Sequence, residues 1–294
     1  MTQPITITEE EAFKPKHTLF EAWRMFVRNK AALAGLFMLL VIVFVALFGS
    51  NIYPVDAFDM VGPPLTPPGE SGFWLGTDYL GRDILAGIIN GSRATLAVGG
   101  AAAFCTVVLG LLIGASAGFY GGRVDNILMR VTEFFQVLPP LLLAMVLVTL
   151  FSPSLITITI AIGVVSWPGI ARLTRSEFLS IRKREYIMAE RAIGSRNRRL
   201  IWKVILPNGM PPLVVASALS VGSANLFEAG LSFLGLSDPN IMSWGLMIGA
   251  SREYIFVCWW GITFPGMAIF FTVLSISLIG DGLNDAFNPK LRER

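Results

Sequence analysis

The sequence contains little of the material from which most catalytic or metal sites are built. Its 294 residues include one histidine, two cysteines and 15% charged side chains, against about 25% charged residues in an ordinary soluble domain. Two cysteines exclude a disulfide scaffold, and the single His17 excludes a histidine-based catalytic or metal site. Intrinsic disorder is excluded by the 54% hydrophobic content and the mean hydropathy of +0.65, because disorder needs low hydrophobicity.

The phosphate-binding motifs of nucleotide enzymes are missing as well. A G-x-x-x-x-G-K-[ST] loop requires a Gly-Lys pair, which does not occur, and no G-x-G-x-x-G fingerprint is present. We therefore expect a non-catalytic chain that binds no cofactor and no metal. The net charge of +3 does not indicate nucleic-acid binding, because it follows from the membrane topology described below.

Long uncharged runs are what the sequence does have. They cover 31–55, 94–122, 134–171, 204–227 and 254–280. A helix needs about 20 apolar residues to cross the bilayer core, so the third run is too long for one crossing and must break, as Ser152-Pro153-Ser154 predicts. The sequence predicts an all-α polytopic membrane protein with six spans, at about 31–50, 94–118, 134–151, 155–172, 210–230 and 258–280.

The basic residues predict which side of the membrane each loop occupies. Twenty of the 23 Lys and Arg residues lie in the N-terminus, 119–133, 172–203 and the C-terminus, whereas the opposite loops hold only Arg82, Arg93 and Arg252. Because Lys and Arg are held in the cytoplasm, both termini are expected there. Residues 18–30 have the apolar spacing of an amphipathic helix on the membrane surface, although the frayed start of span 1 is an alternative.

Four segments follow from this topology. They are a cytoplasmic tail with the amphipathic helix (1–30), the first span with an extracytoplasmic loop (31–93), a five-helix core containing a cytoplasmic loop at 173–209 (94–281) and a cytoplasmic tail (282–294). In the outer loop, Asp78 can cap a helix that starts near Tyr79. The glycine- and alanine-rich second span predicts close packing against other helices, in this chain or in a partner.

The loop at 173–209 is the most highly charged part of the chain. It reads as a helix, a left-handed turn at Gly194, a second helix that Ser195 can cap, and a break at Pro207 to Pro212. Positive-inside topology with contact to lipid headgroups is one interpretation of its charge. A docking element for a cytoplasmic partner is the other.

Residues 186–208 resemble the EAA loop of bacterial ABC importer permeases. That loop reads Glu-Ala-Ala, three residues, Gly, nine residues, an aliphatic residue, one residue, Leu-Pro. Met188 and Glu190 depart from this pattern. The residues that match it are Ala189, Gly194, Val204, Leu206 and Pro207.

Four further segments, in order along nearly the whole chain, are similar to the dipeptide, oligopeptide and nickel permease family. The first contains Gly76, Thr77, Asp78, Gly81, Arg82 and Asp83. The others are Glu228 to Leu236, which resembles EAxLSFLGLG, Trp244-Gly245, which resembles the end of PEWG, and Gly280 to Pro289, which resembles GDGLRDALDP. The long outer loop and the C-terminal segment resemble the "C"-type of the two permease subunits.

The resemblance implies a multi-pass subunit of an ATP-driven importer in the bacterial inner membrane, with peptides as the first substrate class and nickel complexes, opines and sugars as alternatives. The implied partners are a second permease, two cytoplasmic ATPase subunits that bind ATP and Mg²⁺, an extracytoplasmic substrate-binding protein and membrane lipid. The residues implied in ATPase docking are Ala189, Glu190, Arg191, Ala192, Ile193, Gly194, Ser195, Arg198, Leu206 and Pro207.

An ion-coupled secondary transporter is the alternative function. Such carriers place ionisable residues inside the membrane, and only Glu228 and Asp281 come near that description. These two carboxylates and Trp244 are the candidate residues for a substrate path or gate.

Overall fold

The computed structural model describes residues 18–287, and within them every regular element is helical. Residues 1–17 and 288–294, which include His17 and the end of the C-terminal segment, lie outside the described residues. The helices are α1 (Thr18–Arg28), α2 (Lys30–Ile52), α3 (Ile84–Tyr120), α4 (Gly122–Val137), α5 (Pro140–Phe151), α6 (Leu155–Arg182), α7 (Glu185–Ala192), α8 (Asn197–Arg199), a π-helical turn (Leu200–Ile205), α9 (Leu206–Phe233), α10 (Trp244–Ser251), a 3-10 turn (Arg252–Tyr254) and α11 (Trp260–Phe287).

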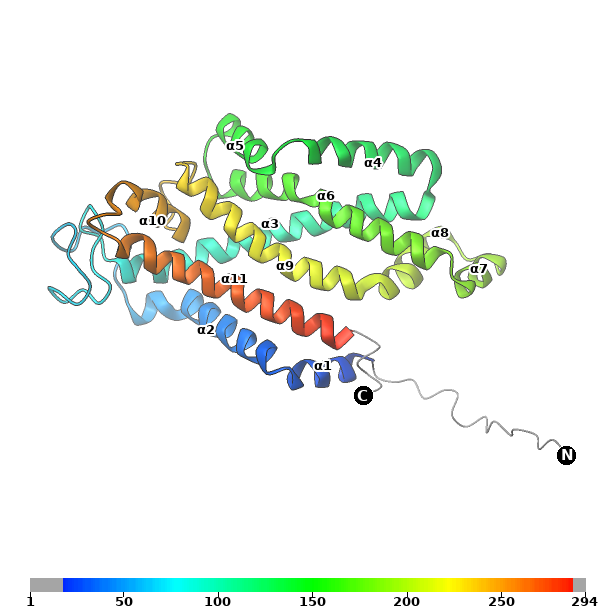
Figure 1. Ribbon diagram of the computed structural model, residues 1–294, viewed down its shortest axis with the longest axis horizontal. Coiled ribbons are helices and arrows are strands. Elements are labelled where there is room, and N and C mark those ends of the chain that lie inside the picture. Colours follow the sequence, from blue (N-terminus) through cyan, green and yellow to red (C-terminus); the bar gives the residue numbers. More distant parts are fainter. Residues whose placement is uncertain (1–17, 288–294) are drawn as a thin grey trace.

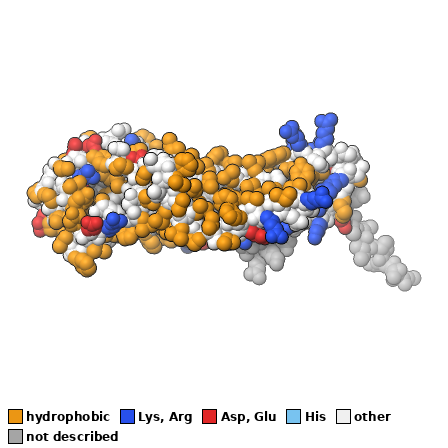
Figure 2. Space-filling model, turned by 90° about the horizontal axis from the view of Figure 1, so that it is seen from above, with side chains coloured by type: hydrophobic (Ala, Val, Ile, Leu, Met, Phe, Trp, Pro, Cys, Tyr) orange, Lys and Arg blue, Asp and Glu red, His pale blue; other side chains and the backbone are white. Residues whose placement is uncertain are grey.

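The long helices lie side by side in an elongated bundle with two distinct ends (Figure 1). One end, here called the loop end, carries residues 53–83 and α10. The other, here called the α7 end, carries α1, α7 and α8. Figure 2 shows hydrophobic side chains over the middle of the bundle and blue Lys and Arg side chains gathered toward the α7 end. This pattern is that of a protein whose waist is surrounded by lipid.

Five helical stretches are long and apolar enough to cross a membrane: α2, α3, α6, the run from Asn197 to Phe233, and α11. The predicted span at 134–151 is wrong as a single helix. Residues up to Val137 belong to α4, and α5 begins at Pro140 after a bend of 87° between the two helices. Pro140 lacks a backbone N–H and Pro139 disfavours helical geometry at Leu138, which explains the break. The chain has six crossings if this bent pair is counted as one.

The break predicted at Ser152-Pro153-Ser154 is confirmed. Ser152 has a left-handed backbone with φ of 69°, and Ser154 is the N-cap of α6, whose hydroxyl accepts a hydrogen bond from the Thr157 N–H. Asp238 adds a second acceptor at the start of α6, for the Leu155 N–H at 3.3 Å. Capping by side chains therefore separates α5 from α6.

Three predicted helix boundaries are wrong. The helix of span 2 starts at Ile84 and not near Tyr79, because Asp83 rather than Asp78 caps it. The prolines at 207–212 do not break the chain, and α9 runs through them. Membrane helices tolerate such prolines where neighbouring helices or local π-helical adjustments satisfy the freed carbonyl groups, and here a π-helical turn directly precedes α9. The last helix continues beyond Asp281 to Phe287.

Residues 18–28 form a helix that is separate from the first span. Asn29 ends it by capping α2, its side-chain oxygen accepting hydrogen bonds from the Ala31 and Ala32 N–H groups. Phe26 is buried near Ala286 of α11, whereas Trp23 is 57% exposed. The structure thus favours a distinct amphipathic helix over a frayed start of span 1, and its position on the membrane surface stays a prediction.

The glycines of α3 pack inside this chain. Gly110, Gly114 and Gly118 recur at four-residue spacing and face α6. A Cβ at Gly118 would lie 2.6 Å from the Cβ of Phe178, and one at Gly114 would clash with the backbone carbonyl of Ala171. The small residues let the two helix backbones approach, as the composition of span 2 predicts.

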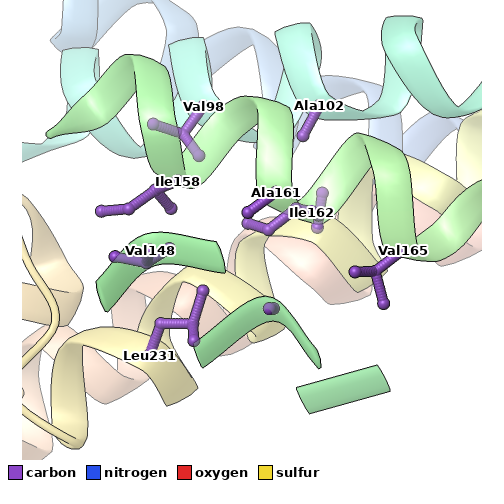
Figure 3. Close-up of a cluster of buried hydrophobic side chains, with 10 residues drawn as sticks. Val98, Ala102, Val148, Ile158, Ala161, Ile162, Val165 and Leu231 are labelled. Atoms are coloured by element: carbon purple, nitrogen blue, oxygen red, sulfur yellow. The ribbon is translucent and has the colours of Figure 1, made fainter. Parts of the chain in front are cut away.

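The main hydrophobic core lies where α3, α5, α6 and α9 meet (Figure 3). Val148 of α5 is fully buried beside Ile158 and Ile162 of α6. The core also contains Val98, Ala102, Ala144, Ala161, Val165, Ala224 and Leu231. In lipid such packing contributes close van der Waals contact and not transfer from water, and this contact fixes α5 to the bundle although its axis departs from that of α4.

Candidate functional site

The α7 helix is attached firmly to its end of the bundle. Ile187 is fully buried in a cluster with Phe178 of α6 and Leu200 of the π-helical turn. The Arg191 guanidinium lies 5.4 Å from the centre of the Phe119 ring, at the end of α3. These contacts join α7 to α3, α6 and the start of α9.

Glu190 organises the turn that follows α7. Its carboxylate accepts a hydrogen bond from the Ser195 hydroxyl and lies 3.9 Å from the Arg199 guanidinium. Gly194 occupies the left-handed region at φ of +85°, as predicted, and donates its N–H to the Arg191 carbonyl. The prediction that Ser195 caps the next helix is wrong, because α8 has Arg196 at its N-cap with no side-chain bond. Ser195 faces back toward Glu190 instead.

The exposed side of this turn is a small apolar patch among arginines. Ile193 is 79% exposed, and Ala189 and Ala192 beside it are exposed too. Arg196 and Arg198 are exposed on the following segment. We call these five residues the α7 surface. Of the other residues predicted for docking, Pro207 is exposed, while Leu206 is half-buried in the cluster beneath α7.

At the loop end, Thr77 holds the predicted Gly76–Asp83 motif together. Thr77 is fully buried, and its hydroxyl accepts a hydrogen bond from the Thr66 N–H at 2.9 Å and donates one to the Pro63 carbonyl at 2.6 Å. Its carbonyl accepts from the Trp260 indole N–H at 3.0 Å. The proline-rich loop is thereby fixed to the start of α11.

The glycines of the motif allow this close folding. Gly76 and Gly81 both have φ of +81°. A Cβ at Gly76 would lie 2.5 Å from the Thr66 carbonyl oxygen, and one at Gly81 would clash with the Gly62 carbonyl. Only glycine combines this conformation with this contact.

The charged residues of the motif hold the turn and the start of α3. Asp83 is buried, caps α3 through the Leu85 N–H and accepts a hydrogen bond from the Tyr53 hydroxyl. That bond and burial raise the pKa of Tyr53 to about 12. The Arg82 guanidinium lies 5.1 Å from the centre of the Phe58 ring, and a cavity of about 230 Å³ lies beside Asp78, Arg82 and Asp83.

Asp78 provides a test of how the loop is held. One oxygen, Oδ1, accepts from the Leu80 N–H at 2.8 Å and the Arg82 N–H at 2.9 Å. Burial raises the pKa of its carboxyl, although the two N–H groups partly offset this. A raised pKa means that the folded state holds the proton more tightly, so this contribution to stability is present at acidic pH and is lost as the pH rises toward the raised value.

We expect Asp78→Asn to keep the free energy of unfolding at neutral pH or to raise it, because an amide oxygen still accepts both bonds. Asp78→Ala should lower it by about 1–2 kcal/mol, because two N–H groups lose their partner. Thermal unfolding of the purified chain in detergent between pH 4 and 8 measures both. Equal losses in the two variants would show that the charge, and not the acceptor, holds the turn.

A buried polar cluster joins α9 to α10. Glu228 is 1% exposed, and its Oε1 accepts hydrogen bonds from the Ser232 hydroxyl at 3.0 Å and the Ser243 hydroxyl at 2.8 Å. Ser243 is also the N-cap of α10. Trp244 donates its backbone N–H to Thr95 and its indole N–H to the Ile88 carbonyl, both on α3. Glu228 and Trp244 therefore hold α10 against the long helices.

Glu228 and Asp281 do not form one site. Glu228 lies five residues before the end of α9, which is at the loop end. Asp281 is exposed and lies 21 residues after Trp260, where α11 begins at the same loop end. At ~1.5 Å per helical residue the two carboxylates are separated by most of the bilayer core. The structure does not bring them together as a pair for ion coupling.

The structure also contains a cavity that sequence reasoning missed. An open groove with a volume of about 670 Å³, here called the central cavity, lies among α3, α6, α9 and the bend between α4 and α5. Phe135, Gln136 and Pro140 line it at the bend, and Arg172 lines it from α6. Gln136 and Arg172 also line an adjoining cavity of about 600 Å³ between α4 and α6. The sequence feature that could have predicted the central cavity is Pro139-Pro140 inside an apolar run.

Two known families match the chain. Residues 110–293 match the family described as binding-protein-dependent transport system inner membrane component, and residues 18–68 match the N-terminal TM domain of oligopeptide transport permease C. This chain belongs to the binding-protein-dependent transport permease family. The permease is therefore a multi-pass component of the inner membrane, in a family of transport subunits and not of catalysts.

Several curated relatives resemble the permease over nearly their whole length. It is 42% identical over 281 residues to the di/tripeptide transport system permease protein DppC of Pseudomonas aeruginosa (strain UCBPP-PA14), with 93% of each chain covered. The oligopeptide transport system permease protein OppC of Bacillus subtilis (strain 168) is 33% identical, with 100% of this chain and 98% of the relative covered. These relatives show a permease of the dipeptide and oligopeptide ABC transporter type.

A solved structure shares the fold. It is that of the MetNI methionine ABC transporter in inward facing conformations, with a TM-score of 0.57 and 22% sequence identity, covering 66% of the permease and 93% of that chain.

Proposed function

We propose that the permease is one half of the membrane pathway of an ATP-driven peptide importer. Peptide transport is the activity named for relatives at 33–42% identity that match over most of their length. The partners would be a second permease, two ATPase subunits and a binding protein that delivers the peptide, with lipid around the apolar waist. ATP and Mg²⁺ would be bound by the ATPases, because this chain lacks a phosphate-binding loop.

The α7 end would face the cytoplasm, and both chain termini would lie there. Support comes from the Lys and Arg residues, which gather at this end (Figure 2). The loop end, with its folded 53–83 segment, would then face the binding protein.

The observation that carries the proposal is the α7 surface. An exposed Ile193 flanked by arginines, on a helix whose opposite side is buried against three long helices, is suited to dock in a groove of an ATPase. The apolar residues would anchor the contact, and the arginines would set its orientation and association rate. Closure of the ATPase pair would then move α7 and the attached helices as a rigid body, which is the basis of alternating access.

Reconstitution tests the proposed function. The complex, purified from its native membrane and placed in proteoliposomes, should take up a labelled dipeptide only with ATP on the α7 side and binding protein on the other. Uptake driven by an ion gradient without ATP would instead support the ion-coupled alternative.

A prediction for the loop end concerns Trp74, which is 77% exposed on the segment that Thr77 fixes to α11. Exposed tryptophans on rigid surfaces commonly dominate protein interfaces. We expect Trp74→Ala to raise by about tenfold the binding-protein concentration that gives half-maximal ATPase stimulation. Phe104→Ala is the matched control, because Phe104 is 70% exposed but lies on α3. An unchanged half-maximal concentration for Trp74→Ala would place docking elsewhere.

A further inference from the structure

We propose that the central cavity is a peptide subsite in which Arg172 binds the peptide's C-terminal carboxylate. This inference rests on the proposed function and names a residue and an interaction for it. It starts from the broken span, because the 87° bend between α4 and α5 leaves backbone outside a regular helix at 138–139. Within a membrane, such backbone is tolerated where it is buried in protein or lines a water-filled cavity.

The cavity at the bend has the size and lining of a small-peptide site. Its volume of about 670 Å³ lies within the roughly 300–1,000 Å³ usual for ligand sites. Most of the lining is apolar or carries small hydroxyl groups, from Thr106, Ser166, Ser220 and Ser223. Side chains of this kind accept varied peptide side chains without strong preference.

Among the described residues that line the central cavity, Arg172 is the one ionisable residue. It is exposed, and within residues 18–287 no carboxylate lies within 4.0 Å of its guanidinium. The adjoining cavity also holds Arg130, Glu133, Asp125 and Arg175, but the last two pair bidentately with each other. Arg172 lies at the end of the predicted span 155–172 and faces the cavity without a carboxylate partner, so its guanidinium is free to bind an anion there.

A carboxylate is the ligand that fits this arrangement. The guanidinium donates two parallel hydrogen bonds to a carboxylate, and the unpaired charge leaves the pathway locally positive. Every unmodified peptide ends in a carboxylate, so contact with that group is independent of peptide sequence. The exposure of Arg172 keeps the contact weak, which suits a pathway through which the peptide must move on.

A comparison of two peptides and two permeases tests the proposal. Uptake of a dipeptide and of its C-terminal amide is measured in proteoliposomes for the wild type and Arg172→Gln. Both permeases receive peptide from the same binding protein, so its preference for either peptide cancels when the two ratios are compared. We expect Arg172→Gln to lower dipeptide uptake about tenfold and amide uptake less than twofold, with Arg172→Lys between the wild type and Arg172→Gln for the dipeptide.

Arg123→Gln is the matched control, because it removes a positive charge from an exposed residue of α4 that does not line either cavity. It should change neither uptake. Equal losses of dipeptide and amide uptake in Arg172→Gln would overturn the proposal. Loss of the second permease when Arg172→Gln is purified would also overturn it, because the cavity would then be an assembly surface. Absence of ATP-dependent uptake in the wild type would instead contradict the proposed function.

A second measurement leaves Arg172 in place. Ser223 is exposed and lines the central cavity, so Ser223→Cys, in a chain whose Cys105 and Cys258 are replaced by alanine, should react with a soluble maleimide. Labelling during turnover should slow severalfold with the dipeptide and change less with the amide. The same labelling rate with and without dipeptide would show that peptides bypass this cavity.

Discussion

Gly194→Asp should abolish most transport while the permease remains inserted, folded and bound to its second permease. We expect peptide uptake to fall at least tenfold, and ATP hydrolysis to lose its dependence on peptide and binding protein. Gly194 has open space around it, because a Cβ at this position would meet no atom within 4 Å beyond its two chain neighbours. The change places a carboxylate between Ile193 and the arginines of the α7 surface, where it removes charge complementarity and adds a polar group to an apolar contact.

Gly235→Asp is the matched control for this variant. Gly235 has φ of +86°, against +85° for Gly194, and a Cβ at Gly235 would likewise meet no atom within 4 Å beyond its chain neighbours. Backbone strain of about 1–2 kcal/mol for a non-glycine residue therefore applies equally to both variants. Gly235 lies at the loop end, after α9, so we expect near-normal ATPase coupling. Coupled transport in Gly194→Asp, or equal uncoupling in both variants, would contradict the role given to the α7 surface.

Gly114→Ala adds only one methyl group, but it should destabilise the bundle. The added methyl group would clash with the Ala171 carbonyl and lie 2.7 Å from the Thr174 Cβ, and a backbone carbonyl cannot rotate away as a flexible side chain can. Overpacking of this kind costs about 1–3 kcal/mol, so the midpoint of thermal unfolding in detergent should fall by several degrees.

Gly100→Ala on the same helix is the control, since a Cβ there meets nothing within 4 Å. Its unfolding midpoint should stay unchanged or rise slightly, because alanine favours helix over glycine. Equal midpoints for the two variants would mean that α3 and α6 are not held at the distance the structure shows.

The sequence predicted those features that depend on composition or on one residue's backbone preference. The apolar runs located five of the six predicted spans, because a bilayer demands about 20 apolar residues in each crossing. Gly194 was predicted to be left-handed and is, because the residue after a helix commonly needs that conformation. The α3 glycines were predicted to pack against other helices, and they pack against α6.

Proline produced the main errors, because its effect depends on its neighbours. Pro139 and Pro140 break a span where the chain lines a cavity, whereas Pro211 and Pro212 lie inside a continuous α9. Local sequence does not distinguish these two outcomes. The bend, the central cavity and the place of Arg172 therefore required the tertiary structure.

Glu190 shows that comparison with a sequence motif does not predict side-chain contacts. Its departure from the EAA pattern said nothing about its contacts, and the structure places it as the acceptor for the Ser195 hydroxyl. Capping contacts were likewise misassigned at Asp78, because a neighbouring Asp83 has the same capping ability and lies at the true start of the helix.

The most direct test of the central claim is uptake by the complex purified from its native membrane and reconstituted in proteoliposomes, with ATP and an ion gradient supplied separately. We predict that a second permease and two ATPases copurify with the chain, and that labelled dipeptide enters only when ATP and binding protein lie on opposite sides of the membrane. A lone chain or homodimer that transports under an ion gradient, with no response to ATP, would contradict it.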